Sequence, residues 1–297
     1  MARFNLYDEE FFPSPWQHTW RTFKQSHIAM TGLILLIFFS LTAVIGPFLA
    51  PYDPVEQNTN SLLVPPAWFD SGTIAHLFGT DAVGRDMLSR VIYGCQVTFG
   101  ISILLVIIAM IVGVSLGAVA GMTKGVRSSI LNHLLDSLMA IPTLLIAIVI
   151  VAMLGTGLVN SMWAITLALI PQFVHGTRDF VRDEMKKEYV LAARLDGAGK
   201  SFLFFQSILP NMIELLVVQA TFALSTALLD ITALGFLGLG AQPPLPELGV
   251  MLSAGLEVAY IAPWNLAIPG ICIFLMVLAV NLVGDGLRSA VRKRMSS

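Results

Sequence analysis

The triplet Gly199-Lys200-Ser201 is the first candidate for chemistry in this chain, because it matches the end of a phosphate-binding loop. Such a loop, Gly-x4-Gly-Lys-[Ser/Thr], follows a strand and holds nucleotide phosphates with backbone N–H groups, a lysine and a hydroxyl. The pattern requires its first glycine where this chain has Arg194, and the preceding residues predict a helix. We therefore expect no ATP hydrolysis by the chain itself, so energy must come from a partner or an ion gradient.

Patterns for catalysis and metal binding are also missing from the sequence. Cys95 and Cys272 stand in separate predicted elements without ligand-type spacing, which favours two small buried side chains over a disulfide or a zinc site. Asp81 and Asp86 are separated by valine and arginine where a calcium loop requires oxygen ligands. No Ser/His/Asp set, HExxH motif or carboxylate dyad is placed for catalysis, so we predict no enzyme, cofactor or metal site.

Ionisable residues inside long apolar runs are the remaining candidates, because such groups are costly in a membrane and mark functional sites. Glu214 is expected at a helix N-terminus, where the dipole favours a carboxylate, and Asp285 lies at the end of its run. Asp230 alone is deep, so it is a candidate for lining a passage, with equal weight on an internally hydrogen-bonded acid. An ion-coupled secondary transporter that uses Asp230 is an alternative function. The other two such residues are His133 and Asp136.

The composition predicts the solvent in which these elements lie. Of the 297 residues, 56% are hydrophobic and 12% are charged, whereas soluble domains carry about 25% charged residues. Several apolar runs approach 20 residues, the length of a helix that crosses about 30 Å of hydrocarbon. We therefore predict an all-α membrane protein with six transmembrane helices, at 28–50, 97–121, 130–154, 160–179, 212–238 and 264–287.

The distribution of basic residues predicts the orientation of the six spans. With a cytoplasmic N-terminus, all of the 17 Lys and Arg residues except Arg85 and Arg90 fall on the cytoplasmic side. Cytoplasmic segments are enriched in these residues, so both termini are expected inside. The predicted parts are a cytoplasmic N-terminus at 1–27, the first span at 28–50, a periplasmic segment at 51–96, a five-helix core at 97–287 with a cytoplasmic segment at 180–211, and a tail at 288–297.

The N-terminal part is expected to contain a short interfacial helix. Serine at a helix N-cap followed by proline is a frequent start, and Ser14-Pro15 has this pattern. Trp16, Trp20 and Phe23 follow at spacings of four and three, which places their rings on one face. Tryptophan is enriched at membrane interfaces, so we predict that this face lies toward the membrane.

The cytoplasmic segment is the one long polar stretch between apolar runs on that side. Its pattern predicts a helix over 179–196 that ends at Gly197, a second helix capped by Ser201, and an end near Pro210. An exposed knob of small and aromatic side chains fits a groove in a partner protein, although a solvated connecting loop is the alternative. The knob would carry Met185, Tyr189, Ala192 and Ala193.

This segment resembles the cytoplasmic "EAA" loop of ABC importer permeases, Glu-Ala-Ala-x3-Gly-x9-Ile-x-Leu-Pro. Leu191 replaces the glutamate and Ser207 the isoleucine. The stretches 76–90, 235–244 and 281–288 are similar to the "C" permeases of the dipeptide/oligopeptide/nickel family, and 125–142 and 187–197 to its Sap-type members. The residues that match the loop in register are Ala192, Ala193, Gly197, Leu209 and Pro210.

The resemblance implies a type I ABC permease in the bacterial inner membrane that moves peptides and, in its Sap-type members, is linked to antimicrobial peptide resistance. Polyamine (putrescine) transport or export, and a structural scaffold role, stay open. The implied partners are a second, SapB-like permease, two cytoplasmic ATPases, a periplasmic binding protein and membrane lipid, without nucleic acid. The implied ATPase-coupling residues are Glu188, Tyr189, Ala192, Ala193, Gly197, Leu209 and Pro210.

Overall fold

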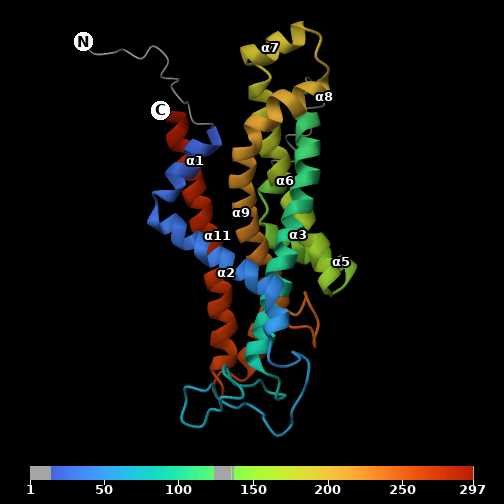
Figure 1. Cartoon of the computed structure of the whole chain (residues 1–297). Helices are drawn as coiled ribbons and strands as arrows, with labels where there is room; N and C mark the ends of the chain where they lie inside the picture. The colour runs from blue at the N-terminus through green and yellow to red at the C-terminus, as the bar shows by residue number, and fades with distance from the viewer. Residues whose placement is uncertain (1–14, 124–134, 136, 297) are drawn as a thin grey trace, which may run out of the picture.

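The computed structural model describes residues 15–123, 135 and 137–296, and the regular elements in this part of the chain are helices (Figure 1). The elements are α1 (Pro15–Lys24), α2 (His27–Leu49), α3 (Met87–Gly121), α5 (Thr143–Leu154), α6 (Leu158–Glu184), α7 (Glu188–Leu195), α8 (Lys200–Phe202), the π-helical turn η1 (Leu203–Ile208), α9 (Leu209–Phe236), α10 (Leu248–Glu257) and α11 (Trp264–Ser296).

Among the described residues, five helices are long and apolar enough to cross a membrane, and each corresponds to a predicted span. They are α2, α3, α6, the continuous helix Lys200–Phe236 and α11. The third predicted span, 130–154, lies partly outside the described residues. Its described part turns at 140–142 and continues as α5, whose 12 residues are too few for a span. Six spans and their orientation therefore stay predictions.

Two predicted boundaries differ from the structure. α3 begins at Met87 instead of residue 97, because Asp86 caps it with a bond of 2.8 Å from Ser89 N. The non-helical segment after α2 therefore ends at residue 86. At the other end of the chain, α11 continues to Ser296, so the predicted tail is helical through that residue.

A glycine series on α3 allows close packing against α6. A Cβ atom added at Gly117 would lie 2.7 Å from the Cβ atom of Thr177, and one at Gly121 would lie 2.8 Å from that of Val181. Small residues at intervals of four allow two helix backbones to approach closely. The series therefore lets α3 and α6 pack closely, and these two helices form the centre of the bundle.

The short helix α1 packs against α11. It starts at Pro15 as predicted, whereas Ser14 lies outside the described residues. Phe23 is buried, and it leaves no room for a side chain at Gly286 of α11. The Trp20 ring stacks on Phe23 with centroids 5.5 Å apart. One of the predicted aromatic residues therefore attaches α1 to the bundle, and the interfacial location stays a prediction.

The helices α3 and α11 bring the two cysteines together. Their Sγ atoms are 3.2 Å apart, and both residues are free thiols. The sequence did not predict this contact, because the cysteines stand in separate elements 177 positions apart. Their proximity depends on how the two helices pack, which neither local sequence contains.

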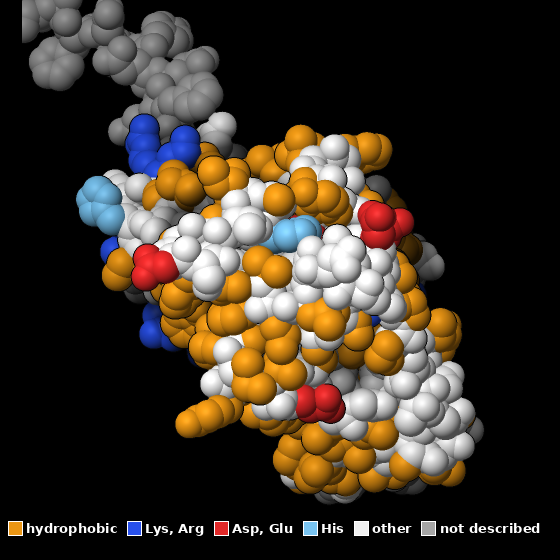
Figure 2. Space-filling model, turned by 90° about the horizontal axis from the view of Figure 1, so that it is seen from below, with side chains coloured by type: hydrophobic (Ala, Val, Ile, Leu, Met, Phe, Trp, Pro, Cys, Tyr) orange, Lys and Arg blue, Asp and Glu red, His pale blue; other side chains and the backbone are white. Residues whose placement is uncertain are grey.

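The segment 51–86, which we call the cap, lies at the end of the molecule opposite α7 (Figure 1). Asp86 is buried and accepts hydrogen bonds from Ser89 N and the Ser89 hydroxyl, both at 2.8 Å. His76 Nδ1 lies 2.9 Å from the other Asp86 oxygen. Figure 2 shows this end of the molecule, where hydrophobic side chains surround a few isolated charged ones.

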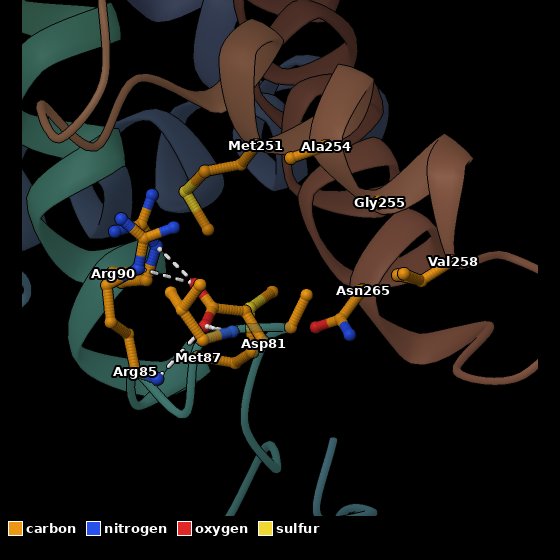
Figure 3. A pocket seen from close by; sticks show the side chains of 11 residues that line it. Asp81, Arg85, Met87, Arg90, Met251, Ala254, Gly255, Val258 and Asn265 are labelled. Carbon is orange, nitrogen blue, oxygen red and sulfur yellow. Dashed lines mark hydrogen bonds and ion pairs between the residues drawn. The ribbon is translucent and has the colours of Figure 1, made fainter. Parts of the chain in front are cut away.

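A second carboxylate of the cap forms ion pairs with two arginines. Asp81 Oδ2 lies 2.7 Å from Arg85 Nε and 3.5 Å from Arg90 Nε (Figure 3). Arg90 Nη1 also donates to the Pro54 carbonyl at 3.0 Å, although the side chain is buried. Asp81 and Asp86, which the sequence analysis had rejected as a calcium pair, therefore have arginine, histidine and serine partners.

An additional helix, α10, is attached to α3 and lines a pocket together with the cap. Glu247 is fully buried and caps it, accepting from Gly249 N at 2.9 Å and Val250 N at 3.0 Å. The Thr98 hydroxyl of α3 donates to the same carboxylate at 3.0 Å. α10 and α3 are thus fixed together, and the sequence analysis missed this helix because its ten residues are shorter than a span.

Candidate functional site

The predicted cytoplasmic segment extends beyond the bundle, and α7 lies across the ends of α6 and α9 (Figure 1). The prediction of one helix over 179–196 is wrong, because α6 ends at Glu184 and the chain turns at 185–187. Lys187 is extended, with φ −73° and ψ 148°, before Glu188 opens α7. This break separates α7 from the membrane-crossing helix and changes its direction.

The return from α7 to the bundle also differs from the prediction. The chain from Lys200 to Phe236 is one continuous helix, so no second short helix ends near Pro210. Ser201 makes no capping hydrogen bond, and Gly199 occupies the N-cap. A proline removes a backbone donor, and the wider π-helical turn before Pro210 is a known way to accommodate such a defect.

Gly197 ends α7, as the sequence predicted. Its φ of +89° lies in the left-handed region that glycine adopts without a Cβ clash. The Ala198 N–H donates to the Ala193 carbonyl at 3.0 Å, and the Gly197 N–H donates to the Arg194 carbonyl at 3.1 Å. This closing pattern is typical of a helix that stops at a glycine.

Tyr189 connects the three helices that meet at this end. Its hydroxyl donates to the Glu184 carboxylate of α6 and accepts from Asn211 Nδ2 of α9 at 3.0 Å. Asn211 Nδ2 also donates to the Ser207 carbonyl at 3.1 Å, and Lys187 Nζ lies 2.8 Å from Glu184. Burial and then the bond to Glu184 raise the pKa of Tyr189 to about 12.

The exposed face of α7 differs in part from the predicted knob. Val190 is fully buried and attaches α7 to the rest of the protein, whereas the Leu195 side chain is 89% exposed. Leu191, which departs from the family pattern, is also exposed. Of the predicted residues, Glu188, Tyr189 and Ala192 are exposed, and Ala193 is half-buried.

The remaining predicted coupling residues lie at the start of α9. Leu209 packs against the cluster that contains Ile208 and Met212, and Pro210 is exposed. Asn211 is next to them and bonds to Tyr189, so this part of the motif is in contact with α7. The sequence analysis missed Glu184, Val190 and Asn211, because their partners are not at helical spacing along the chain.

Asp230 is separate from this segment. It lies in the second half of α9 and is 6% exposed, with Thr143 of α5 as its polar neighbour. Its Oδ2 atom has no hydrogen-bond partner among the residues that the structure describes. The structure therefore places this acid between helices of the same chain.

Comparisons with known proteins agree over most of the chain. Residues 113–297 match the family described as "Binding-protein-dependent transport system inner membrane component", and residues 14–66 match the "N-terminal TM domain of oligopeptide transport permease C". The dipeptide transport system permease protein DppC of Escherichia coli is 47% identical over 95% of this chain and 94% of its own. The peptide transport system permease protein SapC of Salmonella typhimurium is 45% identical over 97% of each chain.

The di/tripeptide transport system permease protein DppC of Pseudomonas aeruginosa is 43% identical over 96% of this chain and 94% of its own. The solved inward-facing MetNI methionine ABC transporter contains a chain with a TM-score of 0.54 and 17% identity. That match covers 69% of this chain and 97% of the other, so the fold is shared. Because the family match covers more than half of the sequence, the chain belongs to the family of binding-protein-dependent transport system inner membrane components.

Proposed function

We propose that this chain is a permease subunit of a bacterial ABC transporter that moves short peptides, driven by cytoplasmic ATPases that bind α7. The observation that carries the proposal is the placement of α7. It lies outside the bundle with an exposed face, and Tyr189 at its base bonds to both α6 and α9. A helix presented in this way fits a groove on a partner.

The connections of Tyr189 suggest how movement of α7 reaches the membrane. Glu184 is the last residue of α6, and Asn211 lies near the start of α9. Both of these helices run through the bundle, and α6 packs tightly on the glycines of α3. A displacement of α7 on ATP binding would therefore move α6 and α9 relative to the rest, which is the change that alternating access needs.

The location of basic residues supports the orientation. The end of the molecule that carries α7 also carries α1 and the C-terminal part of α11 (Figure 1). The basic residues in α1, α6, α7 and α11 thus gather at one end, whereas Arg85 lies in the cap and Arg90, at the start of α3, contacts it. By the positive-inside rule, α7 and both termini face the cytoplasm and the cap faces the periplasm.

The family implies a complex with a second permease, two ATPases and a binding protein. We propose that the ATPases bind α7, that the binding protein docks on the cap, and that the second permease is SapB-like. Relatives named for dipeptides and for the Sap system are similarly close, at 43–47% identity. Peptide transport is therefore the shared proposal, Sap-type resistance to antimicrobial peptides is the narrower one, and polyamine transport is the alternative. Asp230 stays a candidate for lining the passage, because its buried Oδ2 has no partner among the described residues.

The proposed coupling of α7 to the ATPases can be tested at the two glycines that follow this helix. A Cβ atom at Gly197 or at Gly199 meets nothing within 4 Å, but Gly197 alone has a positive φ. We expect Gly197→Val to reduce ATP-driven peptide uptake by the complex at least tenfold, because a β-branched residue is strained there. Gly199→Val is the matched control, and Gly197→Asn should retain most activity because asparagine tolerates this conformation.

Two results would contradict this proposal. Equal uptake by Gly197→Val and Gly199→Val, with normal ATPase stimulation, would show that the shape of the segment does not couple the subunits. Uptake by this chain alone in liposomes, without ATPases, would instead favour an ion-coupled carrier. Copurification of the ATPases with each variant would separate a loss of docking from a loss of transmission.

A further inference from the structure

A cavity lies between α6, α9 and α11, apart from both α7 and the cap. Its volume is about 310 Å³, at the lower end of the range of about 300–1,000 Å³ for ligand pockets. On α11 its lining residues fall at positions 280, 281, 284, 285 and 288, a spacing that places them on one helix face. All but Val280 belong to the 281–288 stretch, which the coupling mechanism does not use. Its polar lining residues are Gln172, Gln219, Asn281, Asp285, Arg288 and Thr221.

The charged and amide side chains of this cavity have no partners within the described part of the chain. Asp285 and Arg288 form no ion pair with each other or with another described residue, although three positions separate them. Gln219 Oε1 is buried without a hydrogen-bond partner. Asp285 and Arg288 are exposed, so their charges are free to bind a ligand, and a donor from that ligand would satisfy the buried acceptor Gln219 Oε1. The cavity thus offers charged and amide groups to a polar ligand.

We propose that this cavity is the site where this subunit holds a short peptide through its two charged ends. The proposal rests on peptide transport as the function. A peptide at neutral pH carries an ammonium group, a carboxylate and amide groups between them. Asp285 would bind the ammonium group, and the Arg288 guanidinium would bind the carboxylate in a bidentate manner.

The remaining side chains fit the middle of such a ligand. The carboxamides of Gln172, Gln219 and Asn281 each supply a donor and an acceptor, as a peptide group requires. A polyamine has several positive charges and no negative one, so it would leave Arg288 unpaired and repelled. The cavity therefore selects zwitterionic peptides over polyamines, a distinction that the family relationship does not make.

The test uses the complete transporter in proteoliposomes and four substrates. They are a dipeptide with free ends, its C-terminal amide, its N-acetyl form and putrescine. We expect Arg288→Gln to raise the KM for the free dipeptide about tenfold, as loss of a charged hydrogen bond does, and to change the KM for the amide less than threefold. Asp285→Asn should likewise raise the KM for the free dipeptide about tenfold, and it should change the KM for the N-acetyl form less than threefold. Arg288→Lys should give a smaller increase for the free dipeptide.

Arg292→Gln is the matched control, because Arg292 is exposed on the same helix and does not line the cavity. Its KM for every substrate should equal that of the unmodified transporter. A uniform loss for all substrates in the Arg288 and Asp285 variants would overturn the inference. Loss of copurification with the second permease would also overturn it, because the cavity would then be an interface. The unmodified transporter could take up peptide while the variants discriminate among the four substrates just as it does. In that case only the inference about the cavity is wrong. If the unmodified transporter takes up no peptide, the proposed function fails as well.

Discussion

The two ends of the molecule use a buried carboxylate in opposite ways. In the cap, Asp86 is 3% exposed and all its partners come from residues 76–89, so it fixes a short local loop and the start of α3. At the other end, where α6 turns into α7, Glu184 is equally buried, but its partner Tyr189 is 41% exposed and belongs to another helix. One carboxylate stabilises a local structure, and the other connects two helices.

This difference explains which end can move. The cap is held by the bonds of Asp86 and by the arginines on Asp81, and next to it Glu247 joins α10 to α3. The base of α7 is held mainly by Val190 and by one hydroxyl group. Segments with few buried contacts open at lower free energy than the rest of a protein. A partner can therefore displace α7 while the opposite end keeps its shape.

The strongest test of this comparison is removal of the cap carboxylate. Asp86→Ala deletes the N-cap of α3, worth about 0.5–2 kcal/mol, and leaves buried donors unpaired at about 1–3 kcal/mol. We expect the free energy of unfolding of the detergent-purified protein to fall by about 3 kcal/mol, measured by denaturant titration. Asp53→Ala is the control, because Asp53 is an exposed residue of the same cap and accepts from Val55 N. Equal effects of the two variants would refute a rigid cap.

Much of the fold follows from the sequence, because it depends on apolar length and on glycine. Five long helices of the described residues match predicted spans, and Gly197 ends α7 because glycine permits the positive φ that this helix stop has. The break at 185–187 was not predictable in this way, since no glycine or proline marks it. Nor did Pro210 end a helix, because the π-helical turn before it continues the chain into α9.

The candidate site was predictable only where its residues are close in sequence. Glu184 and Tyr189 are five positions apart, which is not a helical spacing, and they meet only because the chain turns between them. Asn211 reaches Tyr189 from 22 positions away. The cavity at Asp285 and Arg288 has the same origin, because three helices form it. Such sites depend on packing and are not contained in a local motif.

A smaller loss of stability is expected when the attachment of α7 is weakened. Tyr189→Phe keeps the ring but removes the hydroxyl that joins Glu184 to Asn211. We expect a fall of about 1 kcal/mol in the free energy of unfolding, the net value of a typical hydrogen bond, but a severalfold loss of ATP-driven uptake. Tyr260→Phe is the control, since Tyr260 is fully exposed and makes no side-chain bond among the described residues. A variant with normal uptake would show that force reaches the bundle by another route.

The smallest effect is the titration of the same hydroxyl, which tests whether it is bonded as described. Tyrosine has a pKa of about 10 in an unfolded chain, and in the folded protein the pKa of Tyr189 is about 12. Its contribution to stability is thus complete below pH 10 and is lost as the pH rises from 10 through 12. The difference in tyrosinate absorbance between the unmodified protein and Tyr189→Phe should show this late transition. Glu184→Gln should lower the pKa of Tyr189 only in part, because burial is the larger cause. A midpoint near pH 10 in the unmodified protein would mean that the hydroxyl is solvated and that α7 is attached to α6 in another way.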